Sequence, residues 1–496
     1  MGWYLGFDLG TTTSKGILVD RCGRPLGSEA VTHEVSFPRP GWAEQDPEAW
    51  WEEFSRICRV LLSRGDVRPE EVKAIGCSGM MPTVVALDAS STPLRPAILY
   101  GIDSRAADEI RIIQQIQASS GETGRALTSQ SAAPKVLWLK RNEPEVFRKA
   151  CTIVSATGFL VYRLTGIATI DVPTAVEFNP LFDPVKLEWD PRWCCELGIP
   201  QAILPRVVPA TEVVGRVTPW AAQKTGIPAG TPVIAGTGDV LADRLAMGMT
   251  LPGDSALTYG TTMTVSVLVK SIKNDSRLLI GPYVIPGLYR VSGATNASGS
   301  LLSWLCRILG SDAETDDWRR RIEQDASGIE PGSEGLIVLP YFNGERTPIF
   351  DDRVRGLIAG LTLSHTPAHI YRAFIEATAY ALLHNLEVME ENGCRPERVV
   401  SSGGGTRSEL WLQIVSDVTG LEQVILDQLW GAPLGAAFLA AIATGAIGVF
   451  EEVKTWTRPQ RIIRPNAERS RLYADYYRVF RQLYLATRPY LHQLSR

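Results

Sequence analysis

The segment Asp8-Leu9-Gly10-Thr11-Thr12-Thr13-Ser14-Lys15 has a near copy in the second half of the chain, Thr258-Tyr259-Gly260-Thr261-Thr262-Met263-Thr264. In each, a Gly-Thr-Thr turn joins two runs rich in β-branched and aromatic residues, which is typical of a β-hairpin. Glycine lets the backbone approach a ligand closely, and hydroxyl and N–H groups donate hydrogen bonds to phosphate oxygens. One such turn would be ordinary. Two of them, one in each half, predict a nucleotide clamped between two related domains.

Length and composition limit the classes of protein to consider. A chain of 496 residues is too long for one ordinary core, so we expect two large domains. The net charge of −4 gives no reason to expect nucleic acid or an anionic membrane as a partner. The eight cysteines are dispersed, without Cys-x-x-Cys or His-rich spacing, so we expect no structural zinc and a reducing, cytoplasmic environment. The first strand begins at once, without an apolar leader.

Strand-like and helix-like segments alternate in both halves, which predicts an α/β fold. The strands expected are 72–77, 83–87, 232–235 and 398–402. The helices expected are 46–62, 104–118, 134–142, 371–392, 408–418 and 467–495. The apolar run 431–450 is rich in Ala and Gly and contains Pro433, so we interpret it as a buried helix rather than a membrane span.

A turn at Leu251-Pro252-Gly253-Asp254 marks the expected domain boundary. We therefore predict an N-terminal domain over 1–249 with the first hairpin and a C-terminal domain over 250–450 with the second. Residues 451–496 are predicted to form a C-terminal helical tail, with a solvent-facing terminal helix over 467–495. The two halves give the only repeat that we detect in the sequence.

Two aspartates follow predicted strands at places where a carboxylate could carry chemistry. Asp8 ends a strand just before the first turn, where it could hold Mg²⁺ through water; the alternative is a turn-capping residue. Asp239 follows Gly236-Thr237-Gly238 at a predicted helix N-terminus, where the dipole favours its ionised form. A carboxylate there could accept a proton from a substrate hydroxyl, or it could simply cap the helix.

Other loops and residue types offer weaker signals. Gly403-Gly404-Gly405 lies between a strand and a helix and, like the small-residue loop 293–299, would let a flat ring lie against backbone. The sequence has no Gly-Lys dipeptide for a Walker-type loop and no Gly-x-Ser-x-Gly elbow. We expect His365, His369 and His384 to be structural rather than metal ligands.

Ordered motifs along most of the chain resemble the FGGY family of carbohydrate kinases, in the actin-like ATPase superfamily. Besides the two hairpins, the motifs are Gly41-Trp42-Ala43-Glu44-Gln45-Asp46-Pro47, Asp103-Ser104-Arg105-Ala106, Lys135-Val136-Leu137-Trp138-Leu139, Gly236-Thr237-Gly238-Asp239, Gly344-Glu345-Arg346-Thr347-Pro348, Gly360-Leu361-Thr362-Leu363-Ser364-His365 and Gly403-Gly404-Gly405 through Ser416-Asp417. The resemblance implies two actin-like (ribonuclease H-like) domains with a nucleotide and sugar cleft between them. It also implies ATP and Mg²⁺ as cofactors, and members are often dimers, so a homodimer is an expectation.

The resemblance also implies roles for individual residues. Asp239 matches the catalytic base and Asp8 the carboxylate near the metal ion. The substrate positions are expected at Met81, Asp103, Arg105 and Asp239. The nucleotide positions are expected at Gly10, Thr11, Thr12, Thr13, Ser14, Lys15, Gly260, Thr261, Thr262, Gly299, Ser303, Gly403, Gly404, Gly405 and Ser408.

The substrate loop is closest to the xylulokinase-like members of the family but departs from them. Their pattern is Ser-Gly-Gln-Met-His-Gly, and this chain has Ser78-Gly79-Met80-Met81-Pro82-Thr83. Met81 is retained, Pro82 replaces a histidine, and Val240 replaces the asparagine after the base. Glycerol kinases carry Arg-Glu in this loop, so glycerol is disfavoured. We expect a ketopentose such as D-xylulose as acceptor.

Three alternatives stay open from the sequence. The acceptor could be another small polyol, ketose or aldonate, because loss of hydrogen-bonding groups at Pro82 and Val240 changes selectivity strongly. The chain could be a non-catalytic regulator that binds sugar or nucleotide, although a binding module needs no base. An actin- or chaperone-type ATPase is disfavoured by the Gly344–Pro348 motif.

Overall fold

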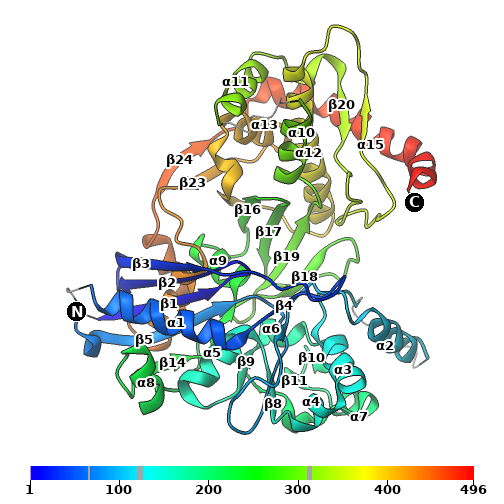
Figure 1. Ribbon diagram of the computed structural model, residues 1–496. Coiled ribbons are helices and arrows are strands. Elements are labelled where there is room, and N and C mark those ends of the chain that lie inside the picture. Colours follow the sequence, from blue (N-terminus) through cyan, green and yellow to red (C-terminus); the bar gives the residue numbers. More distant parts are fainter. Residues whose placement is uncertain (1, 65–66, 120–126, 310–315, 496) are drawn as a thin grey trace. The chain divides into compact units, whose positions relative to one another are not determined.

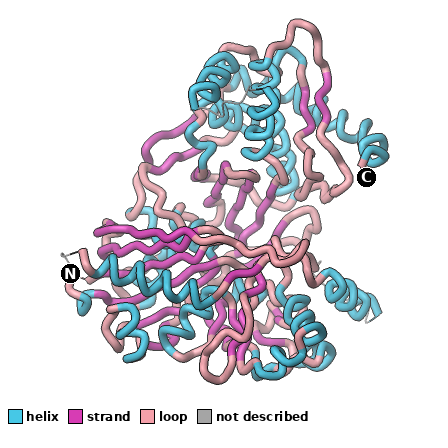
Figure 2. The backbone as a smooth tube through the Cα atoms, in the orientation of Figure 1, coloured by secondary structure: helices cyan, strands magenta, loops and turns pink. Residues whose placement is uncertain are grey.

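The computed structural model describes residues 2–64, 67–119, 127–309 and 316–495, which form two compact units. Unit 1 comprises Met1–Gly248, Pro282–Pro286 and Trp430–Thr457, and unit 2 comprises Met249–Gly281, Gly287–Leu429 and Arg458–Arg496. Strands form the middle of each unit and helices flank them (Figure 1, Figure 2). The α/β prediction is therefore confirmed.

Unit 1 is built on a seven-stranded mixed sheet. Its first three strands form an antiparallel meander, and the next strands run parallel to β1 before the edge strand reverses. The strands are β1 (Trp3–Leu9), β2 (Thr13–Asp20), β3 (Pro25–Thr32), β5 (Val72–Gly79), β14 (Pro232–Ile234), β13 (Val213–Arg216) and the short β15 (Thr237–Gly238), which pairs with β5.

Unit 2 repeats this strand pattern. β16 pairs antiparallel with β17 and parallel with β22, β22 pairs parallel with β23, and β24 reverses at the edge. The strands are β16 (Asp254–Tyr259), β17 (Met263–Val269), β18 (Leu279–Pro282), β19 (Tyr289–Ala294), β22 (Arg398–Ser402), β23 (Gln423–Leu426) and β24 (Pro459–Ile463). Each Gly-Thr-Thr turn joins the first two strands of its sheet, so both predicted hairpins are confirmed.

The sequence explains helix α1 (Pro47–Leu62) of unit 1 residue by residue. Asp46 caps it by accepting a hydrogen bond from the Glu48 N–H, and Pro47 occupies the first helical turn, where its missing N–H costs nothing. Buried Trp50, Phe54 and other apolar residues recur at helical spacing, and this face packs on β2 and β3. The other helices of unit 1 are α2 (Ala107–Ser119), α3 (Ala132–Asn142), α4 (Pro144–Lys149), α5 (Ala156–Thr165), α6 (Val172–Val176), α7 (Pro191–Leu197), α8 (Pro219–Thr225), α9 (Asp239–Ala246) and α14 (Ala432–Ala443).

Unit 1 has a second hydrophobic core, built from residues that lie in the sequence between strands β5 and β13 of the large sheet. It gathers apolar side chains from 84 to 204, with Trp138 and Phe178 among its buried aromatic residues. The small strands around it are β4 (Glu44–Gln45), β6 (Val85–Leu87), β7 (Ala97–Ile98), β8 (Thr152–Val154), β9 (Thr169–Asp171), β10 (Phe182–Asp183), β11 (Glu188–Trp189) and β12 (Arg206–Val208).

Unit 2 is covered by long helices. α12 (Pro367–Glu391) packs against α11 (Asp316–Ser327) and α13 (Glu409–Thr419), and α10 (Gly299–Leu309) packs on α12. The terminal helix α15 (Ala467–Leu494) buries a row of aromatic residues that includes Tyr473 and Phe480, so it is not only solvent-facing as the sequence suggested. The remaining strands are β20 (Ile337–Leu339) and β21 (Leu357–Ala359). No helix in the described ranges combines the length and apolarity needed to cross a membrane.

Helix α14 is the buried small-residue helix predicted within 431–450, but it belongs to unit 1. It lies against β1, β5 and α9 because glycines let the backbones approach. A Cβ atom at Gly76 would stand 2.0 Å from the Ala436 carbonyl oxygen, and one at Gly6 would stand 1.9 Å from that of Pro433. The compact units therefore differ from the continuous domains 1–249 and 250–450 proposed from the sequence, since 430–457 returns to unit 1.

We predict that Gly76→Ala lowers the free energy of unfolding of unit 1 by about 2 kcal/mol or more, because backbone must move to admit the methyl group. The matched control is Gly281→Ala, since Gly281 has open space around its Cβ position and ordinary backbone angles. Urea unfolding followed by near-UV circular dichroism measures both variants. Equal transitions for Gly76→Ala and the wild-type chain would contradict the close approach.

Candidate active site

Three parallel strands of unit 1 end side by side and align the first set of candidate residues. Asp8 on β1 pairs in register with Ser78 on β5, and Ser78 pairs with Thr237 on β15. The next row is Leu9, Gly79 and Gly238. Because the carboxyl ends of parallel strands meet at one edge, the first hairpin, the substrate loop and Asp239 emerge together.

Asp8 is buried at the end of β1, and its Oδ1 accepts a 2.7 Å hydrogen bond from the Ser78 hydroxyl. Burial raises the pKa of Asp8 to about 6, although the Ser78 hydrogen bond and the Lys15 ammonium act to lower it. The Asp243 carboxylate, on α9, acts on Asp8 in the same raising direction, and burial raises the pKa of Asp243 as well. Asp243 is partly buried and forms an ion pair with Arg244 at 3.1 Å. Carboxylate oxygens are ligands that a divalent cation accepts, so Asp8 and Asp243 are the residues of this edge that could hold one.

Asp239 is the first residue of α9, immediately after β15. Gly238 occupies the N-cap position, so the alternative interpretation of Asp239 as the capping residue does not match the geometry. The Asp239 Oδ1 accepts a 2.7 Å bond from the Val240 N–H, and the carboxylate is half-buried. The helix dipole at this position favours the ionised form.

The turn that carries Asp239 is fixed by buried hydrogen bonds. The Thr237 hydroxyl donates to the Asp171 Oδ2 at 2.7 Å, and the Thr157 hydroxyl donates to the Thr237 carbonyl at 3.0 Å. Burial raises the pKa of Asp171 to about 6, although the hydroxyls of Thr174 and Thr237 donate to it. Sequence reasoning missed Asp171, because nothing in its local pattern indicates a contact with residue 237.

Met81 lies directly against this turn. A Cβ atom at Gly238 would stand 2.0 Å from the Met81 Sδ, so a side chain at position 238 would displace the methionine from its place against the turn. Val240, the residue after Asp239, is 40% exposed. The structure therefore brings together three of the positions that the sequence placed at the substrate, Met81, Asp239 and Val240.

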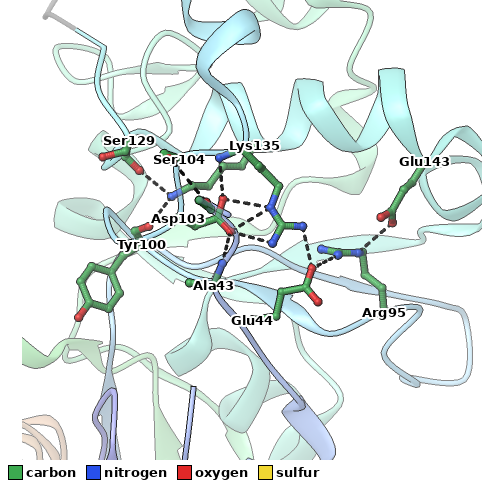
Figure 3. A network of polar contacts seen from close by, with 11 residues as sticks. Ala43, Glu44, Arg95, Tyr100, Asp103, Ser104, Ser129, Lys135 and Glu143 are labelled. Carbon is green, nitrogen blue, oxygen red and sulfur yellow. Dashed lines mark hydrogen bonds and ion pairs between the residues drawn. The ribbon is translucent and has the colours of Figure 1, made fainter. Parts of the chain in front are cut away.

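Asp103 and Arg105 are fully buried and bind each other rather than facing an open space. The Arg105 guanidinium donates to both Asp103 oxygens and to Glu44, and Asp103 also accepts the Ala43 N–H at 2.7 Å. Figure 3 shows Asp103, Glu44 and Ala43 in this network. The contacts give these two residues the role of anchoring the loop at 41–44, and direct contact with a sugar stays a prediction.

Lys135 completes the buried network of Figure 3. Its Nζ donates to the carbonyl oxygens of Tyr100 and Ser129, at 2.9 and 2.6 Å. Burial lowers the pKa of Lys135 to about 7, although the Asp103 carboxylate acts in the opposite direction. The Tyr100 hydroxyl in turn is 2.8 Å from the Thr11 hydroxyl, so the network reaches the tip of the first hairpin.

Unit 2 contains a pocket of about 690 Å³ between its own hairpin and helices. Seven of the residues predicted to bind the nucleotide line it: Gly260, Thr261, Gly299, Ser303, Gly404, Gly405 and Ser408. Thr262 and Gly403 lie beside it, on the hairpin and at the end of β22. Further lining residues that the sequence did not single out are Leu302, Cys306, Arg319, Arg320, Glu323, Tyr371 and Trp411.

Local geometry explains why these residues meet. The Gly299 N–H donates to the Gly260 carbonyl at 3.0 Å, and a Cβ at Gly299 would stand 2.5 Å from that oxygen. Ser408 caps α13 by accepting from the Trp411 N–H at 3.0 Å and donates its own proton to Glu323. Trp411 and Tyr371 had been indistinguishable from core residues, because both occupy buried helical positions.

Glu345 binds the backbone of the small-residue loop 293–299. Its Oε1 accepts hydrogen bonds from the N–H groups of Asn296 and Arg346, at 2.7 and 2.8 Å. Burial raises the pKa of Glu345 to about 8 in spite of these donors. A carboxyl group that binds its proton more tightly when folded adds stability at low pH, and this contribution is lost as the pH rises from its ordinary pKa toward 8.

We predict that the thermal unfolding temperature of unit 2 falls between pH 5 and pH 8.5 and that Glu345→Gln makes this fall smaller, because the amide cannot ionise. Glu330→Gln is the control, since Glu330 is exposed in the same unit. Differential scanning calorimetry across pH measures the slopes. If the unfolding temperature of Glu345→Gln depended on pH as strongly as that of the wild-type chain, Glu345 would not be the group that titrates in this range.

The sequence matches the models of the N-terminal domain of the FGGY family of carbohydrate kinases over residues 3–246 and of its C-terminal domain over 255–444. It is 31% identical to xylulose kinase from Escherichia coli K12, with 98% of this chain and 99% of that protein covered. The crystal structure of xylulose kinase from Rhodospirillum rubrum is 33% identical, with a TM-score of 0.91 over 99% of this chain and 100% of that one. Ligand-bound xylulose kinase from Lactobacillus acidophilus is 25% identical, with a TM-score of 0.90 over the whole of both chains.

Proposed function

Since this chain belongs to the FGGY family of carbohydrate kinases, we propose that it transfers the γ-phosphoryl group of ATP to a hydroxyl group of D-xylulose. The full-length likeness to proteins named xylulose kinase carries this proposal. The position of Met81 against the turn of Asp239 supports it.

In this proposal Asp239 is the catalytic base. Its carboxylate stands at the start of a helix, half-buried, on a turn held by Thr237 and Asp171. It would accept the proton of the attacking hydroxyl as the bond to phosphorus forms. Phosphoryl transfer otherwise asks a protein mainly for positioning and for stabilisation of charge.

The two hairpins would hold the phosphates, and the pocket of unit 2 would hold adenosine. In the first hairpin the N–H groups of Thr11 and Thr12 and the hydroxyls of Thr12 and Thr13 are donors, as is the Thr261 hydroxyl in the second. The Gly10 N–H and the Ser14 hydroxyl instead donate within the protein, to Thr13 and Glu53. Lys15 adds a positive charge. Asp8, with Asp243 near it, offers the oxygen ligands that suit Mg²⁺. When bound, this ion would neutralise charge on the phosphate oxygens. Mg²⁺ in such sites is usually bound by one or two carboxylates together with phosphate oxygens and water, and Asp8 with Asp243 would supply that number.

A panel of acceptors tests the substrate directly. We expect D-xylulose to give the highest kcat/KM for ADP release with Mg·ATP, above L-xylulose, ribulose, xylitol, glycerol and gluconate. A pocket that loses hydrogen-bonding groups discriminates more weakly, so we expect the margin over other ketopentoses to be modest because of Pro82 and Val240. Glycerol or gluconate turned over far better than every ketopentose would overturn the assignment.

We predict that Asp239→Asn lowers kcat by about 10²–10⁴-fold, because the amide cannot accept a proton, while ADP affinity stays within about twofold. Asp108→Asn is the matched control, since Asp108 is a surface carboxylate that is 70% exposed on α2. Single-turnover kinetics and calorimetric titration with ADP measure the two quantities. Unchanged turnover in Asp239→Asn would remove Asp239 from the role of base.

The comparisons do not favour another small ketose, polyol or aldonate as the acceptor, because the full-length relatives at 30% identity or more are named xylulose kinase. We also propose that the enzyme acts in the cytoplasm, which its eight free thiols support because such thiols persist in reducing compartments. A homodimer stays a proposal that rests on the family alone.

A further inference from the structure

The carbonyl oxygens at the tip of the first hairpin are all bound by donors. His33 Nε2 lies 3.0 Å from the Gly10 oxygen, and the backbone N–H of His33 donates to the Thr12 oxygen at 3.0 Å. The Gln45 amide donates to the Thr11 oxygen at 2.7 Å. These oxygens carry partial negative charge that would repel a phosphate. Tying them to donors leaves a loop whose remaining N–H groups suit an anion.

The histidine ring that makes one of these contacts is held between two acceptors. Its Nδ1 lies 2.9 Å from Glu53 Oε2, while its Nε2 lies 3.0 Å from the Gly10 carbonyl. A neutral imidazole has only one N–H, whereas a carboxylate and a carbonyl both only accept. Both contacts are hydrogen bonds at the same time only when the ring is an imidazolium. The Ser14 hydroxyl, on β2, donates to the same Glu53 oxygen at 2.6 Å, so Glu53 also binds the second strand of the hairpin directly.

We propose that His33 is a positioning residue for the phosphates of the nucleotide: as an imidazolium held by Glu53, it fixes the Gly10–Thr12 loop in its anion-binding form, and its deprotonation weakens phosphate binding. This inference rests on the proposed function, in which the loop holds phosphates. The charged ring offsets the Glu53 carboxylate, and loss of its proton leaves that negative charge unpaired near the loop. The effect is screened little, since the ring and the Glu53 side chain are largely shielded from water, at 10% and 13% exposure.

The Glu53 carboxylate is the charged group that acts on the pKa of the ring. Glu53 on α1 bonds to it, Asp8 and Lys15 lie on the two strands of the hairpin, and Glu34 follows it in the chain, while Glu52 and Arg56 on α1 are exposed. Burial opposes the charged ring, yet the hydrogen bond and charge of Glu53 outweigh it, so the pKa of His33 lies above its ordinary 6.5. A raised pKa places the tight-binding form at low pH and the loss of binding above pH 6.5.

The test is the dissociation constant of Mg·ADP between pH 6 and pH 9, measured by calorimetry without sugar. The ratio of each variant to the wild type cancels the titration of the nucleotide itself. His33→Gln keeps a donor but carries no charge, so we expect it to bind about tenfold more weakly at pH 6 and nearly as the wild type at pH 9. Glu53→Gln should move the pH dependence to lower pH. Glu52→Gln, the exposed neighbour, should leave it unchanged.

The ring itself gives a second readout. The Cε1–H resonance of His33, assigned by its loss in His33→Gln, should titrate above pH 6.5 and shift downward in Glu53→Gln. A ratio that stays constant from pH 6 to pH 9, or a ring that titrates below 6.5, would overturn the proposal. Because neither readout uses a sugar, failure of D-xylulose turnover with these results intact would overturn only the substrate assignment.

Discussion

The parallel pairing of β1, β5 and β15 is the constraint on which the site of unit 1 depends. Register places Asp8, Ser78 and Thr237 in one row, so the loops that follow these strands leave the sheet at one edge. The first hairpin, Met81 and Asp239 are far apart in the sequence, and the pairing alone brings them together. Each is then fixed by short contacts: Ser78 with Asp8, Met81 with Gly238, and Asp171 with Thr237.

Unit 2 uses the same strand order for a different task. Its hairpin closes more tightly, since the Gly260 N–H reaches the Thr262 oxygen, whereas the Gly10 N–H reaches the oxygen of Thr13. Its tip also contacts the N-terminus of α10, where unit 1 has His33 and Gln45 instead. A duplicated turn has therefore acquired two environments, one that controls charge behind the loop and one that forms the wall of a pocket.

The sequence predicted what local patterns encode. Both hairpins, the helix at 47–62 and the buried helix within 431–450 follow from residue types and spacing. The sequence could not predict that α14 packs on β1 and β5. The reason for the glycines on these strands is visible only in the structure, where another backbone lies about 2 Å from their Cβ positions. Asp171, Glu323 and Glu53 were missed for a related reason: each acts through a long-range hydrogen bond, and a single carboxylate carries no local signal of one. Asp103 and Arg105 were recognised as a motif, but only their geometry shows them bound to each other.

Helix α14 also bears on how the protein is made. Unit 1 is not complete in the first half of the chain, because its sheet is covered by α14, which follows the unit 2 segments up to Leu429. During synthesis, the face of β1 and β5 that packs against α14 stays uncovered until the helix, which ends at Ala443, has left the ribosome. The duplicated halves are thus tied by the order of the chain: a gene fragment ending before residue 430 would encode a first unit without its closing helix. The first unit can therefore be completed only after residues 249–429 have been synthesised.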